Sequence, residues 1–417
     1  MTRRPIVMVA GRDPTLVGGG HASYVIAHAL AAARAGFSPQ VFCASGRSEL
    51  VATEFGMLRR VASPMHRGYR CERIHRPLLA RGIARYLAGL EDPGPHIVHS
   101  FGAWATSGVE AARMLAPRGV ATIPIASAFT TLAHENRAKV QALGPEHGIA
   151  ARMRYRRDYV WVRAVAGRAE VRGYRESAAV FVNYESVRRL LLDVCHPPPP
   201  VRIMPYAAPA AFQIDTHRAG PPRDPRTPDA PLIVSVARQD PRKGLDVLVR
   251  ALGGLARTGI PFRAVLVGPG PLLGAHRRLV AGLGLEDRVE IPGYVEDVFT
   301  YLDRAAIFVL PSLEEGSGSL ALVEALQAGT AVIASDCDGI PEDLRDGEDA
   351  LLVPPGDVPS LERALAQLLA DPPLRARLAA RARAVFEERF SAQGFADALA
   401  SSYAEMLGFN AAASSAR

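Results

Sequence analysis

The chain has 417 residues, which is enough for two domains of ordinary size. Apolar residues make up 48% and charged residues 22%, the composition of folded globular proteins, so wholesale disorder is excluded. No stretch approaches the roughly 18 consecutive apolar residues of a membrane-spanning helix. The apolar run at residues 5–10 is too short for a secretory signal, and we therefore expect a cytoplasmic protein.

The four cysteines and the charges refine this picture. Cys43, Cys71, Cys195 and Cys337 lie too far apart for a zinc site or a disulfide framework, and we interpret them as small buried hydrophobic residues.

Residues 1–210 carry 28 Lys and Arg against 14 Asp and Glu, whereas the remaining residues carry 21 against 28. The basic half is therefore expected to meet an anionic partner, such as a phosphorylated substrate or a membrane surface. The sequence contains no recognised nucleic-acid-binding module, so we expect no nucleic acid.

In chain order, short β-branched runs alternate with amphipathic helical stretches. In the first half, strands are predicted over 6–10, 40–44, 96–100, 121–125, 179–183 and 201–204, and helices over 22–35, 78–90 and 106–115. Four consecutive prolines (197–200) and an aperiodic stretch rich in Pro, Asp and Arg then interrupt the pattern, which predicts a connector over about 205–231.

The alternation restarts after this break. Strands are predicted over 232–236, 264–267, 289–291, 306–310, 331–334 and 350–353, with helices over 245–257, 272–283, 296–304, 320–328 and through 360–407. Such a pattern is typical of parallel sheets covered by helices. We predict an α/β protein of two Rossmann-like doubly wound domains that face a cleft: residues 1–205, a linker over 206–231, and residues 232–389, with a helix at about 390–408 that folds back on the first domain.

Glycine turns follow two of the predicted strands. Gly18, Gly19 and Gly20 open the first helix, where free backbone N–H groups favour an anion, although a flexible loop is the alternative. After the strand at 264–267, the sequence Val-Gly-Pro-Gly-Pro begins with Val267 and Gly268. Neither segment has the Gly-x-Gly-x-x-Gly spacing of a dinucleotide site, which disfavours hydride transfer.

Two cations follow the first strand of the second half. Arg238 and Lys243 project from the carboxyl edge of the sheet, where they can clamp a diphosphate and neutralise the charge that it gains as a leaving group. Only two of the 49 basic residues are lysines, so a lysine here indicates a need for a compact point charge. A solvated loop charge is the alternative, and it is about equally plausible for Arg242.

The loop after the strand at 306–310 carries two carboxylates at its flanks. Glu315 precedes the sequence Gly316, Ser317, Gly318, Ser319, and the helix that starts at Leu320 contains Glu324. The backbone N–H groups of the loop can donate hydrogen bonds to a ligand. Glu315 is placed to bind sugar hydroxyls, although it can also be an ordinary acidic residue of a loop. Glu324 is placed to accept hydrogen bonds from a ribose diol, although it can also be an exposed helix residue.

Together these motifs resemble, in order, those of retaining glycosyltransferases of family 4. They are the glycines at 18–20, Arg238 with Lys243-Gly244, the turn at 267–270, Pro311-Ser312 with Glu315-Gly316, Glu324-Ala325-Leu326 with Ala328-Gly329, and Gly339-Ile340-Pro341-Glu342. The resemblance covers nearly the whole chain and is strongest over 232–357. It implies the GT-B fold and transfer of a sugar from a nucleotide-diphosphate donor to an acceptor hydroxyl, with retention and without a metal or other cofactor.

The resemblance also implies roles for individual residues. Arg238 and Lys243 would bind the donor diphosphate and Glu324 the ribose. Gly316, Ser317, Gly318, Ser319 and Leu320 would hold the diphosphate and sugar, Glu315 would contact the transferred sugar, and the backbone near Gly293 and Val295 would meet the base. Gly19, Gly20 and Gly268 complete the predicted donor site.

Two departures from the family pattern stand out. The two glutamates are nine positions apart where the family has eight, so either the loop bulges by one residue or Glu315 has a different role. Pro205-Tyr206-Ala207 stands where many family members carry an Asn-Gly turn. This difference bears on the geometry of the hinge between the two domains.

Histidines of the first half supply further candidates. His99 ends the strand at 96–100 and resembles the family residue that meets the donor sugar, so we predict it to be catalytic. Phe101, Trp104 and His134 are predicted on the acceptor side. His96 and His99 point to opposite faces of their strand, which argues against a shared metal. Asp336-Cys337-Asp338 spells an Asp-x-Asp, but it lies in a loop after a strand, and we interpret it as structural.

Eight arginines between Arg152 and Arg175 alternate with Tyr155, Tyr159, Trp161 and Tyr174. Such a helix can lie on anionic lipid at the inner face of the membrane or grip a phosphorylated acceptor. A solvated helix face with packed arginine stems explains it equally well. The acceptor is accordingly open between a lipid-linked molecule, a glycan and a small molecule.

The sequence therefore predicts an enzyme, a hexosyltransferase of the family 4 type. Three alternatives stay open: a nucleotide-sugar epimerase of the same fold, a phosphorylase, which would need Lys139 or Lys243 for pyridoxal phosphate, and a non-catalytic protein that binds anionic glycans. Donor base, sugar, acceptor and oligomeric state are not encoded in any motif that we recognise.

Overall fold

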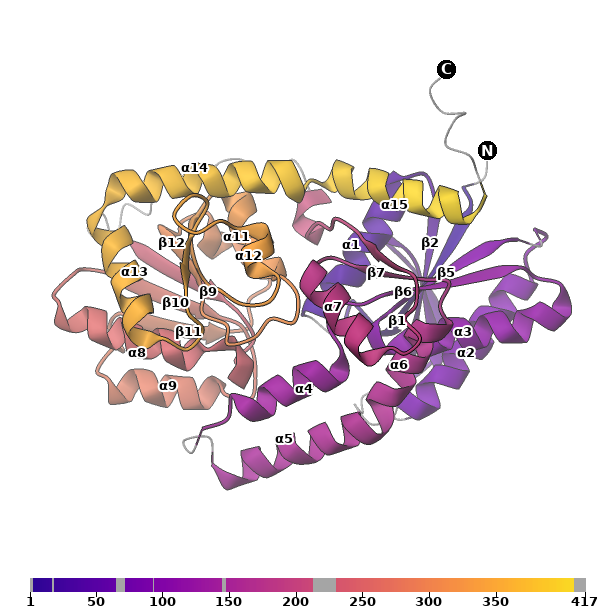
Figure 1. Ribbon diagram of the computed structural model, residues 1–417, viewed down its shortest axis with the longest axis horizontal. Coiled ribbons are helices and arrows are strands. Elements are labelled where there is room, and N and C mark those ends of the chain that lie inside the picture. Colours follow the sequence, from indigo (N-terminus) through magenta and orange to yellow (C-terminus); the bar gives the residue numbers. More distant parts are fainter. Residues whose placement is uncertain are drawn as a thin grey trace, which may run out of the picture. The chain divides into compact units, whose positions relative to one another are not determined.

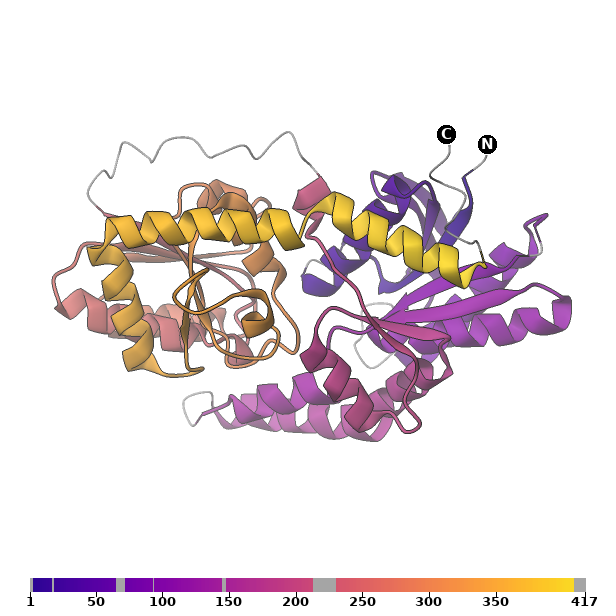
Figure 2. The ribbon, with the colours of Figure 1, turned by 45° about the horizontal axis from the view of Figure 1, so that its top comes forward.

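The computed structural model describes residues 3–16, 19–64, 72–92, 94–144, 148–212 and 230–408. Its contacts divide the chain into two compact units, shown in Figure 1 and Figure 2. The first unit comprises Met1–Glu135, Asp158–Phe212 and Ser391–Arg417, and the second comprises Asn136–Arg157 and Gln213–Phe390. The middle of the predicted linker, residues 213–229, and Gly18 and Cys71 lie outside the described residues.

The first unit is built on an eight-stranded sheet with the order β3-β4-β2-β1-β5-β6-β7-β8. The strands are β1 (Pro5–Arg12), β2 (Ser38–Ser45), β3 (Glu49–Thr53), β4 (Gly56–Ala62), β5 (His96–Phe101), β6 (Thr122–Ser127), β7 (Ala179–Val182) and β8 (Val201–Ile203). All neighbours are parallel except β3 and β4, which form an antiparallel hairpin at one edge. Strands β5 and β7 are buried along their whole length, because helices cover both faces of a parallel sheet.

Helices cover this sheet in two layers. They are α1 (Gly20–Arg34), α2 (Glu72–Ala88), α3 (Ala105–Leu115), α6 (Gly167–Glu176), α7 (Glu185–Val194) and α15 (Ala392–Met406). On one face α2 packs against α3, and on the other α1 packs against α15, the last helix of the chain. Two helices, α4 (Leu132–Gln141) and α5 (Ile149–Trp161), cross the division between the units, and a π-helical turn (Val162–Ala166) joins α5 to α6.

The second unit is built on a six-stranded parallel sheet with the order β11-β10-β9-β12-β13-β14. The strands are β9 (Leu232–Val236), β10 (Arg263–Val267), β11 (Val289–Gly293), β12 (Ile307–Leu310), β13 (Ala331–Ser335) and β14 (Leu351–Val353). The chain runs from β9 outward through β10 to β11, then returns to the other side of β9 with β12. Such a reversal is the switch point at which doubly wound sheets bind ligands, next to the carboxyl ends of the strands.

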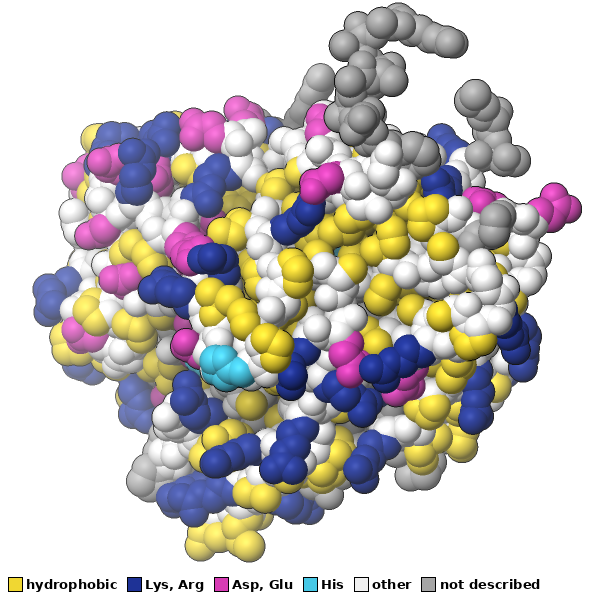
Figure 3. Space-filling model, turned by 45° about the vertical axis from the view of Figure 1, so that its right-hand side comes forward, with side chains coloured by type: hydrophobic (Ala, Val, Ile, Leu, Met, Phe, Trp, Pro, Cys, Tyr) yellow, Lys and Arg dark blue, Asp and Glu magenta, His cyan; other side chains and the backbone are white. Residues whose placement is uncertain are grey.

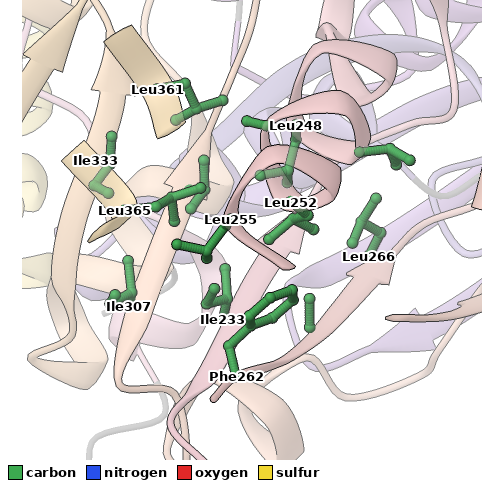
Figure 4. Close-up of a cluster of buried hydrophobic side chains, with 14 of the residues drawn as sticks. Ile233, Leu248, Leu252, Leu255, Phe262, Leu266, Ile307, Ile333, Leu361 and Leu365 are labelled. Atoms are coloured by element: carbon green, nitrogen blue, oxygen red, sulfur yellow. The ribbon is translucent and has the colours of Figure 1, made fainter. Parts of the chain in front are cut away.

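The helices of the second unit are α8 (Leu245–Arg257), α9 (Leu273–Gly282), α10 (Phe299–Leu302), α11 (Leu320–Ala328), α12 (Ile340–Asp343), α13 (Val358–Ala370) and α14 (Pro372–Arg389). Helix α8 packs against α9 and α13, while α11 packs against α10 and α14. Figure 4 shows the core beneath α8, where Leu248, Leu252 and Leu255 meet strand residues such as Ile233 and Ile307. This fully buried aliphatic cluster fixes the strands whose ends carry the candidate site.

The predicted fold class is confirmed, since both sheets are wrapped by helices and are parallel apart from the β3–β4 hairpin at one edge of the first. Some elements differ from the prediction. The hairpin of β3 and β4 was not expected, and the helix predicted over 296–304 is reduced to α10. The helical stretch over 360–407 consists of three helices, because Asp371 and Ser391 each accept a backbone hydrogen bond as N-caps and start a new one.

Candidate functional site

The turn after β9 brings Lys243 to the switch point of the second sheet. Asp240 caps a short 3₁₀ turn (Pro241–Lys243), and Gly244 ends it in the left-handed conformation with φ 59°. A Cβ at Gly244 would lie 2.0 Å from the carbonyl oxygen of Pro311, so only glycine allows this turn to pack against the loop that follows β12. The two loops therefore form one rigid unit.

An ion pair joins these loops at their centre. Lys243 Nζ lies 2.6 Å from Glu315 Oε2, and the two side chains are only 12% and 4% exposed. Ser312 Oγ donates to the other carboxylate oxygen of Glu315 at 2.5 Å. Glu315 is thus held on both oxygens, while Lys243 is a half-buried cation whose described partner is a single carboxylate oxygen.

Arg242 ties the same loops together from beside the pair. Its Nη1 lies 3.2 Å from Glu314 Oε2 and donates to the carbonyl oxygen of Glu315 at 3.2 Å. Its backbone carbonyl accepts from the amide of Leu313 at 2.8 Å. A solvated loop charge was one interpretation of Arg242; the structure instead shows a partly buried residue that shapes the Glu315 loop.

Asp338 holds the Glu315 loop from the opposite side. Its Oδ2 accepts from the amides of Glu315 at 2.7 Å and Gly316 at 2.9 Å. Asp338 adopts φ 50°, the single non-glycine residue with positive φ among those described. The Asp336-Cys337-Asp338 segment thus has a structural role through Asp338. Within the described ranges, no group of three or more His, Cys, Asp or Glu side chains is arranged to hold a metal ion.

The loop ends at an uncapped helix N-terminus. Gly316, Ser317, Gly318 and Ser319 are all buried, and Ser319 is the N-cap of α11 without making a side-chain cap hydrogen bond. The first amides of α11 are therefore available to a ligand, and a helix N-terminus favours an anion. Leu320 is the first residue of α11 and is half-buried.

Glu324 lies one turn further along α11. Burial, assisted by the negative charge of Asp297, raises the pKa of the half-buried Glu324 carboxyl from 4.5 to about 7. A carboxylate that is poorly solvated gains from any hydrogen-bond donor that reaches it, and hydroxyl groups of a ligand are such donors.

Close backbone packing brings the neighbouring loops to the same edge. A Cβ at Gly268 would lie 2.0 Å from the carbonyl oxygen of Ala237, and one at Gly270 would lie 2.4 Å from that of Gln239. The Gly268 amide in turn donates to Gly293 at the end of β11. Arg238, between these contacts, has an exposed side chain, and Val295 after Gly293 is half-buried.

Tyr155 of α5 is a residue near this edge that the sequence did not single out for it. It is 8% exposed, and burial, together with the negative charge of Asp240, raises the pKa of its hydroxyl. Tyr155 therefore lies close to the Asp240 turn within the second unit. An arginine-rich helix gives no signal for this placement, because the tyrosines at 155 and 159 look alike in the sequence.

The glycines of the first unit lie at the corresponding reversal of the first sheet, between β1 and β5. Gly19 is the N-cap of α1 with φ 111°, and Gly20 is its first residue. Both are exposed, and a Cβ at either would meet nothing within 4 Å. No side chain caps this helix, so its first amides are open to an anion.

The catalytic role predicted for His99 does not fit its position. The imidazole is 0% exposed, and its nitrogens are hydrogen-bonded to Tyr403 Oη at 2.7 Å and Ser127 Oγ at 2.8 Å. Burial and the nearby His28 lower the pKa of His99 well below 6.5. A neutral, enclosed ring with both nitrogens engaged presents no atom to a sugar.

The residues predicted on the acceptor side occupy different surroundings. Phe101 is 0% exposed and stacks on His99, and Trp104 is 5% exposed with its ring where a Cβ of Gly11 would fall. Both belong to the core of the first unit, so neither is placed to contact an acceptor. His134 is half-buried near the start of α4, where its amide donates to Thr131.

The architecture matches solved structures over nearly its whole length. Sucrose-phosphate synthase from Thermosynechococcus elongatus superposes with a TM-score of 0.74 at 22% identity, covering 98% of this chain and 100% of that one. HepE of Anabaena, solved with UDP, superposes with a TM-score of 0.63 at 15% identity over 97% and 99% of the two chains. The fold is that of the GT-B glycosyltransferases, two Rossmann-like domains.

The sequence comparisons concentrate on the second unit. Residues 230–371 match the family described as glycosyl transferases group 1, and the resemblance recognised in the motifs is confirmed over this part. The α-D-kanosaminyltransferase of Streptomyces kanamyceticus is 31% identical over 43% of this chain and 46% of its own length. The putative colanic acid biosynthesis glycosyltransferase WcaL of Escherichia coli is 37% identical over 41% and 45%. The matched region thus spans about half the length of these relatives.

Proposed function

We propose that this protein is a retaining glycosyltransferase that moves a sugar from a nucleotide-diphosphate donor to an acceptor hydroxyl. The family match over 230–371, which contains Lys243, Glu315 and Glu324, supports this proposal. So does the likeness in fold to a protein solved with UDP. Relatives bear the names of kanosaminyl- and mannosyltransferases, which fits a hexose as the transferred group.

The Lys243–Glu315 pair carries the proposal. It lies at the switch point of the sheet, where a doubly wound domain binds its ligand, and Glu315 belongs to the loop that leads into the uncapped start of α11. A diphosphate bound at this position would contact the ammonium group of Lys243 and accept hydrogen bonds from the free amides of α11. Arg238, exposed on the adjacent loop, adds a second cation. Gly268, Gly293 and Val295 provide backbone for the base, and Glu324 accepts from the ribose hydroxyls.

The same contacts explain how the bond to the sugar breaks. As the anomeric C–O bond opens, negative charge grows on the leaving diphosphate, and Lys243, Arg238 and the helix amides stabilise it. Glu315, which Ser312 continues to hold, then faces the hydroxyls of the sugar. The acceptor hydroxyl attacks from the face that the diphosphate leaves and gives its proton to the departing diphosphate oxygen, so the anomeric configuration is retained. These cations neutralise the leaving group, so we propose that no metal is required.

The first unit is proposed to receive the acceptor and the sugar end of the donor. Gly19 and Gly20 open α1 toward an anionic group, in the way that the second unit uses α11. The acceptor is a lipid-linked molecule, a glycan or a small molecule, and we propose a cytoplasmic enzyme that works at the inner face of the membrane. Among the described residues, the helices all fall short of the length and hydropathy that crossing a bilayer requires.

Calorimetry with uridine, guanosine, adenosine and thymidine diphosphates tests the donor site. One diphosphate should bind clearly, and Lys243→Ala should weaken it by about tenfold or more, the effect of one charge-assisted contact. Lys139→Ala, which removes the chain's other lysine, is the matched control and should bind as the unaltered protein does. Equal binding by both variants would contradict the assignment, and turnover of the donor sugar without any acceptor would favour an epimerase.

A further inference from the structure

A cavity of about 420 Å³ lies along α6 in the first unit. It is bounded by residues at the start of α4, by the π-helical turn and α6, and by Val194 at the end of α7. We call it the α6 groove. All of its lining residues belong to the first unit, so it is separate from the loops that carry Lys243 and Glu315.

Four arginines form the rim of the α6 groove: Arg163, Arg168, Arg172 and Arg175. All four are exposed. Arg172 lies 3.6 Å from Glu110, a long contact between side chains that are 55% and 28% exposed. Within the described ranges, no ion pair is formed by the other three. Figure 3 shows Lys and Arg side chains next to hydrophobic ones over the lower part of the face that it draws.

The single carboxylate that lines the groove does not neutralise this rim. Glu170 is 2% exposed, and its oxygens accept from the amide of Leu132 at 2.9 Å and from the hydroxyl of Tyr174 at 3.0 Å. These hydrogen bonds turn the carboxylate into the protein, where it fixes the start of α4 against α6. The face that the groove presents to solvent is therefore strongly positive.

Apolar atoms make up much of the rest of the lining. Ala133, Gly167, Val171 and Val194 contribute to it, and no aromatic ring does among the residues that the structure describes. The π-helical turn places Arg163 and Arg168 on the same groove although they are five residues apart. Guanidinium groups beside an aliphatic surface suit a phosphate that carries an alkyl chain, since arginine binds phosphate oxygens in a bidentate manner.

We propose that the α6 groove binds the phosphate group of an amphiphilic molecule, with the arginines on the phosphate and Val171 and Val194 beside its apolar chain. The lining distinguishes this ligand from others. An acidic polysaccharide has no part that would cover the valines, and single-stranded nucleic acid is usually held by aromatic stacking, for which the lining offers no ring. The proposal does not require the transferase reaction.

Vesicle co-sedimentation tests the proposal on the full chain. The protein should bind vesicles that contain phosphatidylglycerol and not vesicles of phosphatidylcholine alone. The triple variant R163A/R168A/R175A should bind about 100-fold more weakly, from three lost contacts between arginine and an anionic surface. The matched control is R81A/R118A/R257A, which removes three exposed arginines elsewhere and leaves the same net charge; it should keep most of the affinity. Equal losses in the two triple variants would show general charge attraction and overturn the proposal.

Two further measurements separate the phosphate from the chain. Inorganic pyrophosphate should compete with the vesicles for the groove. If pyrophosphate bound as tightly as the lipid, the proposed contact of the two valines with the apolar chain would be refuted. Val171→Ser should weaken vesicle binding and leave pyrophosphate binding unchanged. Nucleoside diphosphate affinity should be the same in both triple variants, so a failure of the groove is distinguishable from a failure of the donor site.

Discussion

The imidazole of His99 in β5 and the hydroxyl of Tyr403 in α15 form a hydrogen bond of 2.7 Å across 304 residues of sequence. Both side chains are 0% exposed. Phe101 stacks on His99, and Phe37 contacts Tyr403 edge-on. Phe395 contacts the neighbouring His28. The bond attaches the last helix of the chain to the middle of the first sheet.

Tyr403→Phe should therefore destabilise the first unit. The substitution keeps the ring but leaves a buried imidazole nitrogen without its partner, which costs about 1–3 kcal/mol in the free energy of unfolding. Urea unfolding followed by circular dichroism measures the effect. Tyr294→Phe is the control, because Tyr294 is 70% exposed and its hydroxyl is solvated. Equal stability of the two variants would contradict the structural role of this hydrogen bond.

Acid should destabilise the first unit through the same cluster. Burial lowers the pKa of His28 from 6.5 to about 4. Between these values the unfolded chain binds the proton and the folded protein does not, so the stabilisation is complete above pH 6.5 and is lost as the pH falls toward 4. His99, with its lowered pKa, adds to the loss in the same direction.

The pH dependence can be assigned to His28 by a variant that does not titrate. His28→Phe fits an aromatic environment and should flatten the decline in unfolding free energy by up to about 3 kcal/mol. Denaturant titrations at several pH values between about 7.5 and 4 compare the two proteins. A variant that declines as steeply as the unaltered protein would place the acid sensitivity elsewhere.

Gly268→Ala should disrupt the packing of the loops that follow β9 and β10 in the second unit. Its Cβ would lie 2.0 Å from a backbone oxygen at φ 133°, so the loops after β9 and β10 must move apart, at a cost of about 3 kcal/mol or more. Gly282→Ala at the end of α9 meets nothing within 4 Å and should stabilise slightly. Thermal unfolding of both variants checks the contrast, which the absence of any difference would refute.

Glu324→Gln should increase the stability of the protein at pH 8 and weaken its binding of the donor. Because the folded pKa of about 7 exceeds the ordinary 4.5, the folded protein loses stability as the pH rises from 4.5 through 7. The amide removes this cost, and the variant should be more stable by about 1–3 kcal/mol at pH 8. It should also bind the nucleoside diphosphate more weakly. Unfolding curves at pH 8 and about pH 5, with calorimetry at each, would falsify this expectation if stability were unchanged at both.

The sequence supports a prediction of the second unit because its signals are local. Five of its six strands contain at least three consecutive apolar residues, the exception being β11, and the residues proposed for the donor lie in the loops after the strands, as do Lys243 after β9 and Glu315 after β12. A parallel sheet then brings such loops to one edge without further information. The hairpin of β3 and β4 escaped prediction because half-buried strands that carry charged residues lack this apolar signal.

Local signals of this kind cannot predict that a side chain is buried by a segment that lies far away in the sequence. His99 follows the pattern of a residue at a strand end, yet its surroundings are set by α15, which no local motif connects to β5. Asp338 holds the Glu315 loop, and Tyr155 lies near Asp240, although these segments are far apart in the sequence. Side-chain roles that depend on a second segment require the folded arrangement.

The first unit contains both β1 and α15, with most of the second unit inserted between them. During synthesis, the ribosome must therefore release the six-stranded domain before the eight-stranded one can acquire its final helix. The growing polypeptide holds all eight strands of this sheet, with the site for α15 beside α1 still uncovered, until nearly all of its residues have been translated. A nonsense mutation directly after residue 390 would leave the second unit whole and the first unit incomplete.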